Sequence, residues 1–148
     1  MTPDSTSLYQ ILETASFLGH VSLFEHLTPA CLADLARIVR PVSLDSGQVL
    51  FREGDFSDGF YIIRHGKIAI EIQGRPVTVL DRYECLGELS VLADPGRTAT
   101  ARAVEKSRLV TISSDDFKGL LALNPEISLA LMQTLAQRIR DRENGGAC

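Results

Sequence analysis

The sequence has no tryptophan, only three cysteines and no long run of apolar residues. Cys31, Cys85 and Cys148 lie far apart and are odd in number, which argues against a disulfide framework and against a Cys-x-x-Cys metal or redox site. No stretch approaches the roughly 20 apolar residues that cross a bilayer, and the N-terminus lacks the basic start of a signal peptide. We therefore expect a cytoplasmic chain with reduced cysteines and no membrane segment.

An excess of positive charge is also missing, because 15 Lys and Arg residues stand against 19 Asp and Glu residues, for a net charge of -4. This balance gives no long-range attraction to DNA or anionic lipid, so we expect no direct nucleic-acid binding by this chain. His20, His26 and His65 form no His-x-His or His-x-x-x-His pair, which argues against a metal site. No nucleophile stands beside a base, so we assign no catalytic residue, no metal and no cofactor, and we do not expect an enzyme.

The length of 148 residues, of which 45% are hydrophobic, suits one domain with a real core. The apolar period of residues 6–18 predicts a helix that Ser5 or Ser7 could cap. A second helix is predicted to begin after the N-cap Thr28 and to run through Ile38.

The pattern changes after Pro41, which ends this helix or follows its end. From Val42 onward, short apolar runs are broken by Gly, Asp and Ser, which is typical of a strand-rich sandwich or barrel. The sequence Gln73-Gly74-Arg75 predicts a tight hairpin turn. The strands that we expect are residues 49–52, 60–65, 67–73, 75–80, 98–103 and 107–113.

The last part of the chain is predicted to be helical again. Ser114 to Phe117 has the pattern of a cap with an acidic first turn, beginning a helix that ends at Asn124. Pro125 starts another helix, whose apolar residues fall on one stripe. The stripe consists of Ile127, Leu131, Leu135 and Ile139, widened by Met132 and Ala136. We interpret it first as a core or dimer face and second as a lid over a ligand.

The segment from Leu86 to Ala101, LGELSVLADPGRTATA, has the residues that an anionic sugar would need. Gly87 lets the backbone come close to a ligand, and the amides of a short helix after Glu88 can bind an anion. Arg97 supplies the opposite charge, and its planar fork can hold two phosphate oxygens at once. Glu88 can accept a hydrogen bond from a ribose hydroxyl. This order of residues suits a cyclised ribose phosphate.

The segment 86–101 resembles the phosphate-binding cassette of cyclic-nucleotide-binding domains. That family includes bacterial catabolite activator proteins, protein kinase A regulatory subunits and cyclic-nucleotide-gated channels. Residues 44–66 resemble the strand-and-turn pattern of the same family, and residues 117–138 resemble its closing helices. The familiar positions in the earlier segment are Gly47, Gly54, Asp55, Asp58, Tyr61 and Gly66. The resemblance covers most of the chain, about residues 18–142, and its two motifs occur in the right order.

The resemblance implies a mainly β fold with flanking α-helices. The expected fold is an antiparallel β jelly roll (double-stranded β-helix) of about eight strands, with N-terminal helices and C-terminal helices. Residues 1–148 would then form a single cyclic-nucleotide-binding domain. Its expected parts are an N-terminal helical segment (1–40), a jelly roll (41–113) with the cassette at 86–101, C-terminal lid and output helices (114–143) and a flexible tail (144–148).

The resemblance also implies which residues bind the ligand, cAMP or cGMP. These ligand-binding residues are Gly87, Glu88, Leu89, Ser90, Arg97, Thr98 and Ala99. By carry-over from the cassette, Gly87 approaches the sugar, Glu88 bonds the 2′-hydroxyl, Leu89 and Ser90 offer backbone amides, and Arg97 pairs with the cyclic phosphate. The amide of Thr98 meets the phosphate, while its hydroxyl permits cGMP without requiring it.

The mechanism that the family implies is regulatory. Nucleotide orders residues 87–98, and the helix over residues 125–142 swings in over the pocket and relays binding to an effector domain or protein. A homodimer through the same helix is the other partner that we expect.

Other interpretations of these residues stay open. Glu88 alone could be a carboxylate favoured by a helix dipole, and Arg97 alone could be a solvated loop charge. The whole chain could be a ligand-free jelly-roll module for interaction or dimerisation, or the truncated sensor half of a Crp/Fnr-type transcription regulator. The sequence also departs from the family at Pro95-Gly96-Arg97, where proline usually stands directly before the arginine, and at Cys85-Leu86, where an aromatic is common.

Overall fold

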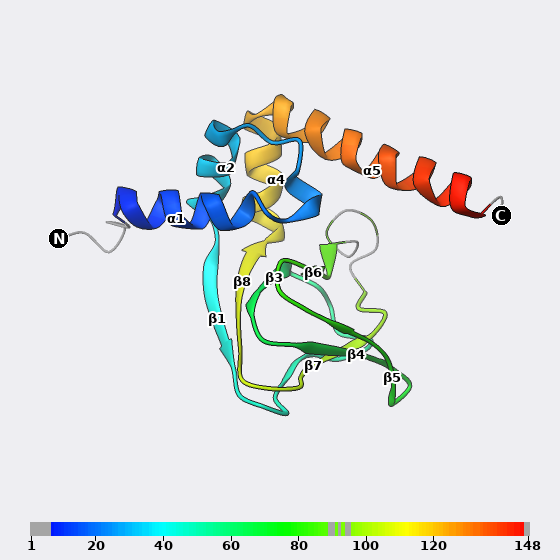
Figure 1. Ribbon diagram of the computed structural model, residues 1–148. Helices are drawn as coiled ribbons and strands as arrows, with labels where there is room; N and C mark the ends of the chain where they lie inside the picture. Colours follow the sequence, from blue (N-terminus) through cyan, green and yellow to red (C-terminus); the bar gives the residue numbers. More distant parts are fainter. Residues whose placement is uncertain (1–6, 89–90, 92, 94–95, 147–148) are drawn as a thin grey trace. The chain divides into compact units, whose positions relative to one another are not determined.

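The computed structural model describes the chain except residues 1–6, 89–90, 92, 94–95 and 147–148 (Figure 1). The chain forms two compact units. The central unit is the segment 38–117, which contains the described strands. The helical unit combines the two ends of the chain, residues 1–37 and 118–148. The expected single domain remains a prediction.

The central unit is built from two four-stranded antiparallel sheets. The first has the order β1 (Arg40–Leu44), β8 (Ser107–Ser113), β3 (Gly59–His65) and β6 (Cys85–Leu86). The second has the order β2 (Val49–Phe51), β7 (Thr100–Ala103), β4 (Ile68–Ile72) and β5 (Arg75–Leu80). The chain crosses repeatedly from one sheet to the other, as in a jelly roll, so the fold class predicted from the sequence is confirmed.

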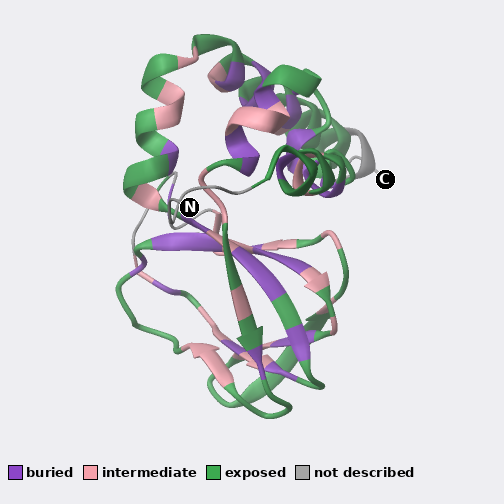
Figure 2. Ribbon diagram, turned by 90° about the vertical axis from the view of Figure 1, so that its left-hand side faces the viewer, coloured by how far each residue is buried: buried purple, intermediate pink, exposed green. Residues whose placement is uncertain are grey.

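Apolar side chains of the two sheets form the core of this sandwich, and Figure 2 shows buried residues recurring along its strands. The core cluster consists of Leu44, Ile63, Ile68, Leu86, Ala101, Ala103 and Leu109. In β3, the neighbours Ile62 and Ile63 are both fully buried, so both faces of this strand are covered. The rings of Phe60 and Phe117 pack edge to face with 5.1 Å between their centroids.

The predicted hairpin between β4 and β5 is confirmed. Gln73 and Gly74 have φ angles of 52° and 78°, the left-handed values that a two-residue turn matching the twist of its strands requires.

Two strands were missing from the prediction. Pro41, which we expected at or after the end of the second helix, follows that helix and pairs with Val110 within β1. The strand β6 has only Cys85 and Leu86, too short a run to show any alternation.

The N-terminal part of the helical unit follows its capping signals. In α1 (Leu8–Leu18), Ser7 accepts a hydrogen bond from the Gln10 amide in a capping box. A short 3₁₀ helix, η1 (Ser22–Phe24), leads to α2 (Pro29–Ala36), where Thr28 accepts from the amide of Cys31. The α2 helix ends before Ile38, earlier than the sequence suggested.

The C-terminal helices begin with α4 (Ser114–Leu123) and end with α5 (Pro125–Gly146). The cap of α4 is Ser113, which accepts a hydrogen bond of 3.1 Å from the amide of Asp116, so the cap lies one residue earlier than predicted. The helix α5 extends through residues 144–146, which we expected in a flexible tail. Among the described residues, no helix is long and apolar enough to span a bilayer.

The apolar stripe of α5 is divided between buried and exposed positions. Ile127 and Leu131 are buried, and Leu135 is half-buried. Ile139 and Met132 are 61% and 58% exposed. The first half of the predicted stripe therefore belongs to the core, and the second half does not.

Candidate functional site

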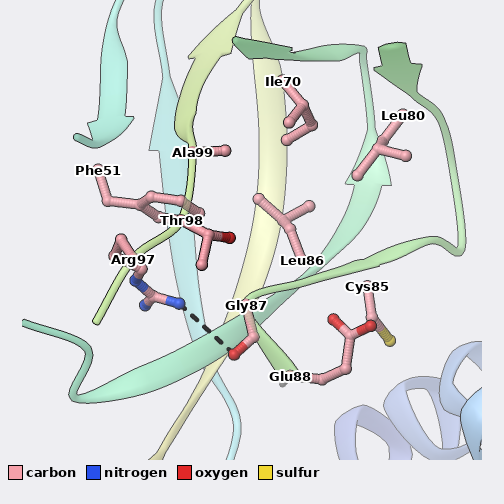
Figure 3. Close-up of a pocket in the computed structure, with 10 residues that line it drawn as sticks. All are labelled: Phe51, Ile70, Leu80, Cys85, Leu86, Gly87, Glu88, Arg97, Thr98 and Ala99. Carbon is pink, nitrogen blue, oxygen red and sulfur yellow. Dashed lines mark hydrogen bonds between the residues drawn. The ribbon is translucent and has the colours of Figure 1, made fainter. Parts of the chain in front are cut away.

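The central unit contains a cavity of about 210 Å³ between its strands and the segment that follows β6 (Figure 3). Its lining residues are Phe51, Ile70, Leu80, Cys85, Leu86, Gly87, Glu88, Arg97, Thr98 and Ala99. They come from strands of both sheets and from the chain on either side of residues 89–96. The cavity is thus made by the jelly roll and by the segment that the sequence marked as a cassette.

The two kinds of lining residue supply different chemistry. Ile70, Leu80 and Leu86 provide an apolar wall, while Glu88 and Arg97 bring a carboxylate and a guanidinium to the same cavity. Figure 3 shows the Arg97 guanidinium directed toward the Gly87 carbonyl, with Glu88 attached on the other side of Gly87. Such a cavity suits a ligand with a flat apolar part and an anionic, hydroxyl-bearing part.

The most unusual residue in this site is Arg97, because its cationic side chain is only 5% exposed. Its Nη2 donates a hydrogen bond of 2.7 Å to the carbonyl of Gly59, and its Nη1 makes a longer contact of 3.5 Å with the carbonyl of Gly87. Its Nε is buried and has no hydrogen-bond partner among the described residues. Arg97, which lines the cavity, therefore carries a buried donor that the described part of the chain does not satisfy.

Electrostatics around Arg97 favour an anion. Burial lowers the pKa of Arg97, and the nearby Tyr61, Asp58 and Asp55 oppose this effect. Loss of water around the guanidinium thus outweighs the support from these neighbours. A negatively charged ligand beside the guanidinium would stabilise the charged form of the arginine.

The main chain of Arg97 is fixed by the loop between β2 and β3. The amide of Arg97 donates to the carbonyl of Asp55, and the amide of Gly54 donates to the carbonyl of Arg97, both at 2.8 Å. An isolated β-bridge joins Phe56 to Gly96 next to this pair. The arginine is therefore held as if in a short strand, although it lies outside β7.

Gly87 makes room for the guanidinium. Its φ angle of +85° lies in the left-handed region that glycine adopts without strain. A Cβ at this position would also overlap Nη1 of Arg97. Glycine is thus required at position 87 both by the positive φ angle and by the nearby guanidinium of Arg97. The close approach of a ligand would be a third reason.

Tyr61 lies next to Arg97 without lining the cavity. The Arg97 guanidinium is 5.9 Å from the centroid of its ring. Burial and the charge of Asp58 raise the pKa of Tyr61, while Arg97 and a hydrogen bond with Thr111 lower it to a lesser degree. Tyr61 is consequently a neutral ring beside the cation.

Five of the seven predicted ligand-binding residues line the cavity together: Gly87, Glu88, Arg97, Thr98 and Ala99. Leu89 and Ser90 lie outside the described residues. Their assignment to a ligand remains a prediction, and Pro95, where the sequence departs from the family, also lies outside the described residues.

Other lining residues were not predicted: Phe51, Ile70, Leu80, Cys85 and Leu86. They lie on strands β2, β4, β5 and β6, and Phe51 precedes Ala99 by 48 residues. Cys85 and Leu86 directly precede Gly87, so their position in sequence was a usable signal. For the three others, no sequence signal connected them with the cassette.

The family model for the cyclic nucleotide-binding domain matches residues 41–124. The chain belongs to the cyclic nucleotide-binding domain family. The matched region includes all the described lining residues of the cavity.

Individual relatives agree with this assignment. The chain is 34% identical over 133 residues to a CRP-like cAMP-activated global transcriptional regulator of Mycobacterium tuberculosis, covering 86% of this chain. It spans only 59% of the length of that regulator. The crystal structure of the N-terminal domain of a transcriptional regulator from Streptomyces coelicolor A3(2) matches with a TM-score of 0.79 and 30% identity, covering 87% of this chain and 94% of that one.

A third comparison concerns the fold alone. The regulatory domain of Toxoplasma gondii PKA, solved with cAMP, matches with a TM-score of 0.75 and 19% identity, covering 90% of this chain and 51% of that one. The jelly roll with flanking helices is therefore shared with a eukaryotic regulatory domain as well as with bacterial regulators.

Proposed function

We propose that this chain is a sensor module that binds a cyclic nucleotide, cAMP or cGMP, in the cavity of the central unit. One observation carries the proposal: Arg97 is a buried cation at the cavity wall whose Nε lacks a hydrogen-bond partner among the described residues. A buried cation with an unsatisfied donor favours an anionic ligand. A cyclic phosphate has one negative charge and oxygen acceptors that match a guanidinium.

The residues of the cavity have separate roles in this proposal. Arg97 binds the cyclic phosphate, and Glu88 accepts a hydrogen bond from the ribose 2′-hydroxyl. Leu89 and Ser90 offer amides, and Thr98 and Ala99 complete the wall beside the phosphate. Gly87 admits the sugar. We assign this site binding and no reaction, with the nucleotide as ligand and no cofactor.

Both purines suit the apolar wall of the cavity. The apolar residues Ile70, Leu80 and Leu86 can contact either base. The side chain of Thr98 is exposed, so its hydroxyl is accessible to a guanine without being committed to one. Because the relative from Mycobacterium tuberculosis is described as cAMP-activated, we favour cAMP.

The partner of the sensor is expected at α5. Leu129, Met132 and Ile139 are 55%, 58% and 61% exposed, and their spacing of three and seven residues puts them on one helix face. Such a face suits a homodimer or an effector domain. The proposal includes both kinds of partner and a cytoplasmic location. It does not include direct contact of this chain with nucleic acid.

Calorimetric titration with cAMP and cGMP tests the proposal. The natural chain should bind at least one of them, and Arg97→Ala should weaken binding on the order of 100-fold, because it removes a charge-assisted pair of hydrogen bonds. Arg102→Ala is the matched control, since Arg102 pairs with Glu71 at 3.3 Å and does not line the cavity. Absence of heat with every cyclic nucleotide would favour the ligand-free interaction module instead.

The relay is tested separately by hydrogen exchange. Saturating nucleotide should change the protection of amides in α5, because the proposed output is a change in that helix. Equal protection with and without nucleotide would contradict the relay while leaving binding intact.

A further inference from the structure

We propose that Ser57 is a positioning residue for Arg97. Ser57 lies outside the cavity and acts through a carbonyl that it shares with the arginine. This inference rests on the proposed function, because it concerns how the phosphate-binding guanidinium is held before a nucleotide arrives.

The geometry centres on the carbonyl oxygen of Gly59. It accepts a hydrogen bond of 3.0 Å from Oγ of Ser57 and one of 2.7 Å from Nη2 of Arg97. A carbonyl oxygen has two lone pairs, so these two donors fill its capacity. Ser57 is only 4% exposed, which makes its hydroxyl one of the few buried polar groups of the central unit.

The position of this carbonyl is fixed from the opposite side as well. Gly59 pairs with Ser113 of β8, and a Cβ on Gly59 would overlap the carbonyl oxygen of Ile112. The preceding carbonyl, of Asp58, accepts a hydrogen bond of 2.7 Å from the amide of Ser114. The backbone at residues 58–59 therefore cannot follow the arginine if the side chain moves.

A fixed acceptor determines how the guanidinium is presented. When Nη2 is held by Gly59, the planar group can turn only about that contact, which limits how Arg97 is presented at the cavity wall. The hydroxyl of Ser57 occupies one of the two lone pairs of this carbonyl and so restricts Nη2 of Arg97 to the other. Without that hydroxyl, Nη2 can shift between the two lone pairs, Arg97 gains freedom, and ordering it again lowers the affinity for a ligand.

The matched control is another buried serine. Ser107 is 1% exposed; its Oγ donates at 2.8 Å to the carbonyl of Glu105 and accepts at 3.2 Å from the amide of Lys67, and neither bond involves Arg97. Ser57→Ala and Ser107→Ala each remove one buried hydroxyl, so both should lower the melting temperature, Ser107→Ala by more because it also leaves the Lys67 amide without its partner. Only Ser57→Ala should also lower the affinity for cAMP, by about three- to tenfold, the range that one hydrogen bond covers.

A double-mutant cycle separates positioning from a general loss of packing. In an Arg97→Lys background, the shorter point charge cannot use the Gly59 carbonyl in the same geometry, so Ser57→Ala should have little further effect on cAMP affinity. Ser57→Thr keeps the hydroxyl and should retain most of the affinity if it folds. These measurements use the full chain and calorimetry with cAMP, or with cGMP if that is the ligand bound.

The outcomes distinguish this inference from the proposed function. If the natural chain binds nucleotide but Ser57→Ala binds as tightly as Ser107→Ala, or if the effects of Ser57→Ala and Arg97→Lys are additive, the positioning role is wrong and the sensor proposal stands. If the natural chain binds no cyclic nucleotide, both are wrong.

Discussion

The guanidinium of Arg97 lies over the ring of Phe51, with 4.1 Å between Cζ and the ring centroid. The Phe51 ring in turn stacks on Tyr61 at a centroid distance of 6.0 Å. A cation over an aromatic face is attracted by the ring quadrupole, and more strongly where water is excluded. Phe51, at the end of β2, therefore stabilises a charge that belongs to a distant part of the sequence.

Replacing Phe51 by leucine should weaken nucleotide binding. The substitution keeps an apolar side chain in the cavity but removes the ring beneath Arg97, a contact of roughly 0.5 to 2 kcal/mol, or about 2- to 30-fold in affinity. Phe51→Tyr keeps the ring and serves as the control. Calorimetry with cAMP checks both variants, and equal affinities for all three chains would show that the stacking contributes nothing to binding.

A methyl group at Gly87 should interfere with Arg97. Gly87→Ala meets both the left-handed φ of +85° and the overlap with Nη1, so we expect lower stability and at least a tenfold loss of nucleotide affinity, an order-of-magnitude figure for a displaced guanidinium. Gly74→Ala is the control, because Gly74 has a similar φ of +78° and no atom within 4 Å of the added methyl.

Thermal unfolding and calorimetry of these two glycine variants separate strain from overlap. Gly74→Ala should lose only the backbone contribution, about 1 kcal/mol, and bind normally. If Gly74→Ala weakened binding as much as Gly87→Ala, a contact with Arg97 would not be the cause.

Arg97→Met should abolish nucleotide binding and, at the same time, remove the free-energy cost of burying a charge. The pKa of Arg97 is lowered in the folded chain because burial outweighs its neighbours, so at neutral pH, below both pKa values, the charged form is disfavoured by folding. Methionine is similar in length and uncharged. We expect the melting temperature, measured without nucleotide, to fall by no more than in Ser57→Ala, because relief from the buried charge offsets the lost hydrogen bond to Gly59; a larger decrease would contradict the sign of this charge effect.

The raised pKa of Tyr61 predicts that the folded chain loses stability at alkaline pH. Its pKa is raised above the ordinary value of 10.0, so below pH 10 the folded and unfolded states are both protonated and the contribution is fully present. As the pH rises from there through the folded-state pKa, the unfolded chain loses its proton first and stability falls. Urea unfolding of the natural chain and of Tyr61→Phe should show a smaller decrease in the variant, and parallel profiles would refute the prediction.

The sequence predicted the cassette better than the cavity. The local pattern was enough to identify Gly87, Glu88 and Arg97, because these residues lie close in sequence and have distinct chemistry. Phe51 and Gly59 could not be found in this way. Their relation to Arg97 depends on the loop between β2 and β3 lying beside residues 96–97, which only the folded backbone establishes.

The difference between local signals and contacts of distant residues also explains the errors in the fold prediction. Helix starts at Ser7 and Thr28 were predictable because a cap is a local hydrogen bond. The strand β1 was missed because its partner β8 is far away in the sequence, as the pairing of Pro41 with Val110 shows. No local pattern reveals such a pairing. The last turns of α5, residues 144–146, were misjudged because glycine and charge indicated a tail where the helix continues.

The hydrogen bond from the Ser114 amide to the Asp58 carbonyl joins the first residue of α4 to the peptide next to the one that holds Arg97. The two peptides meet at Cα of Gly59, and each is a stiff plane. Because both carbonyls are held, the acceptor of Arg97 and the first residue of α4 are attached to the same short, restrained piece of main chain. The wall of the pocket and the beginning of a helix are thus connected through two adjacent peptides.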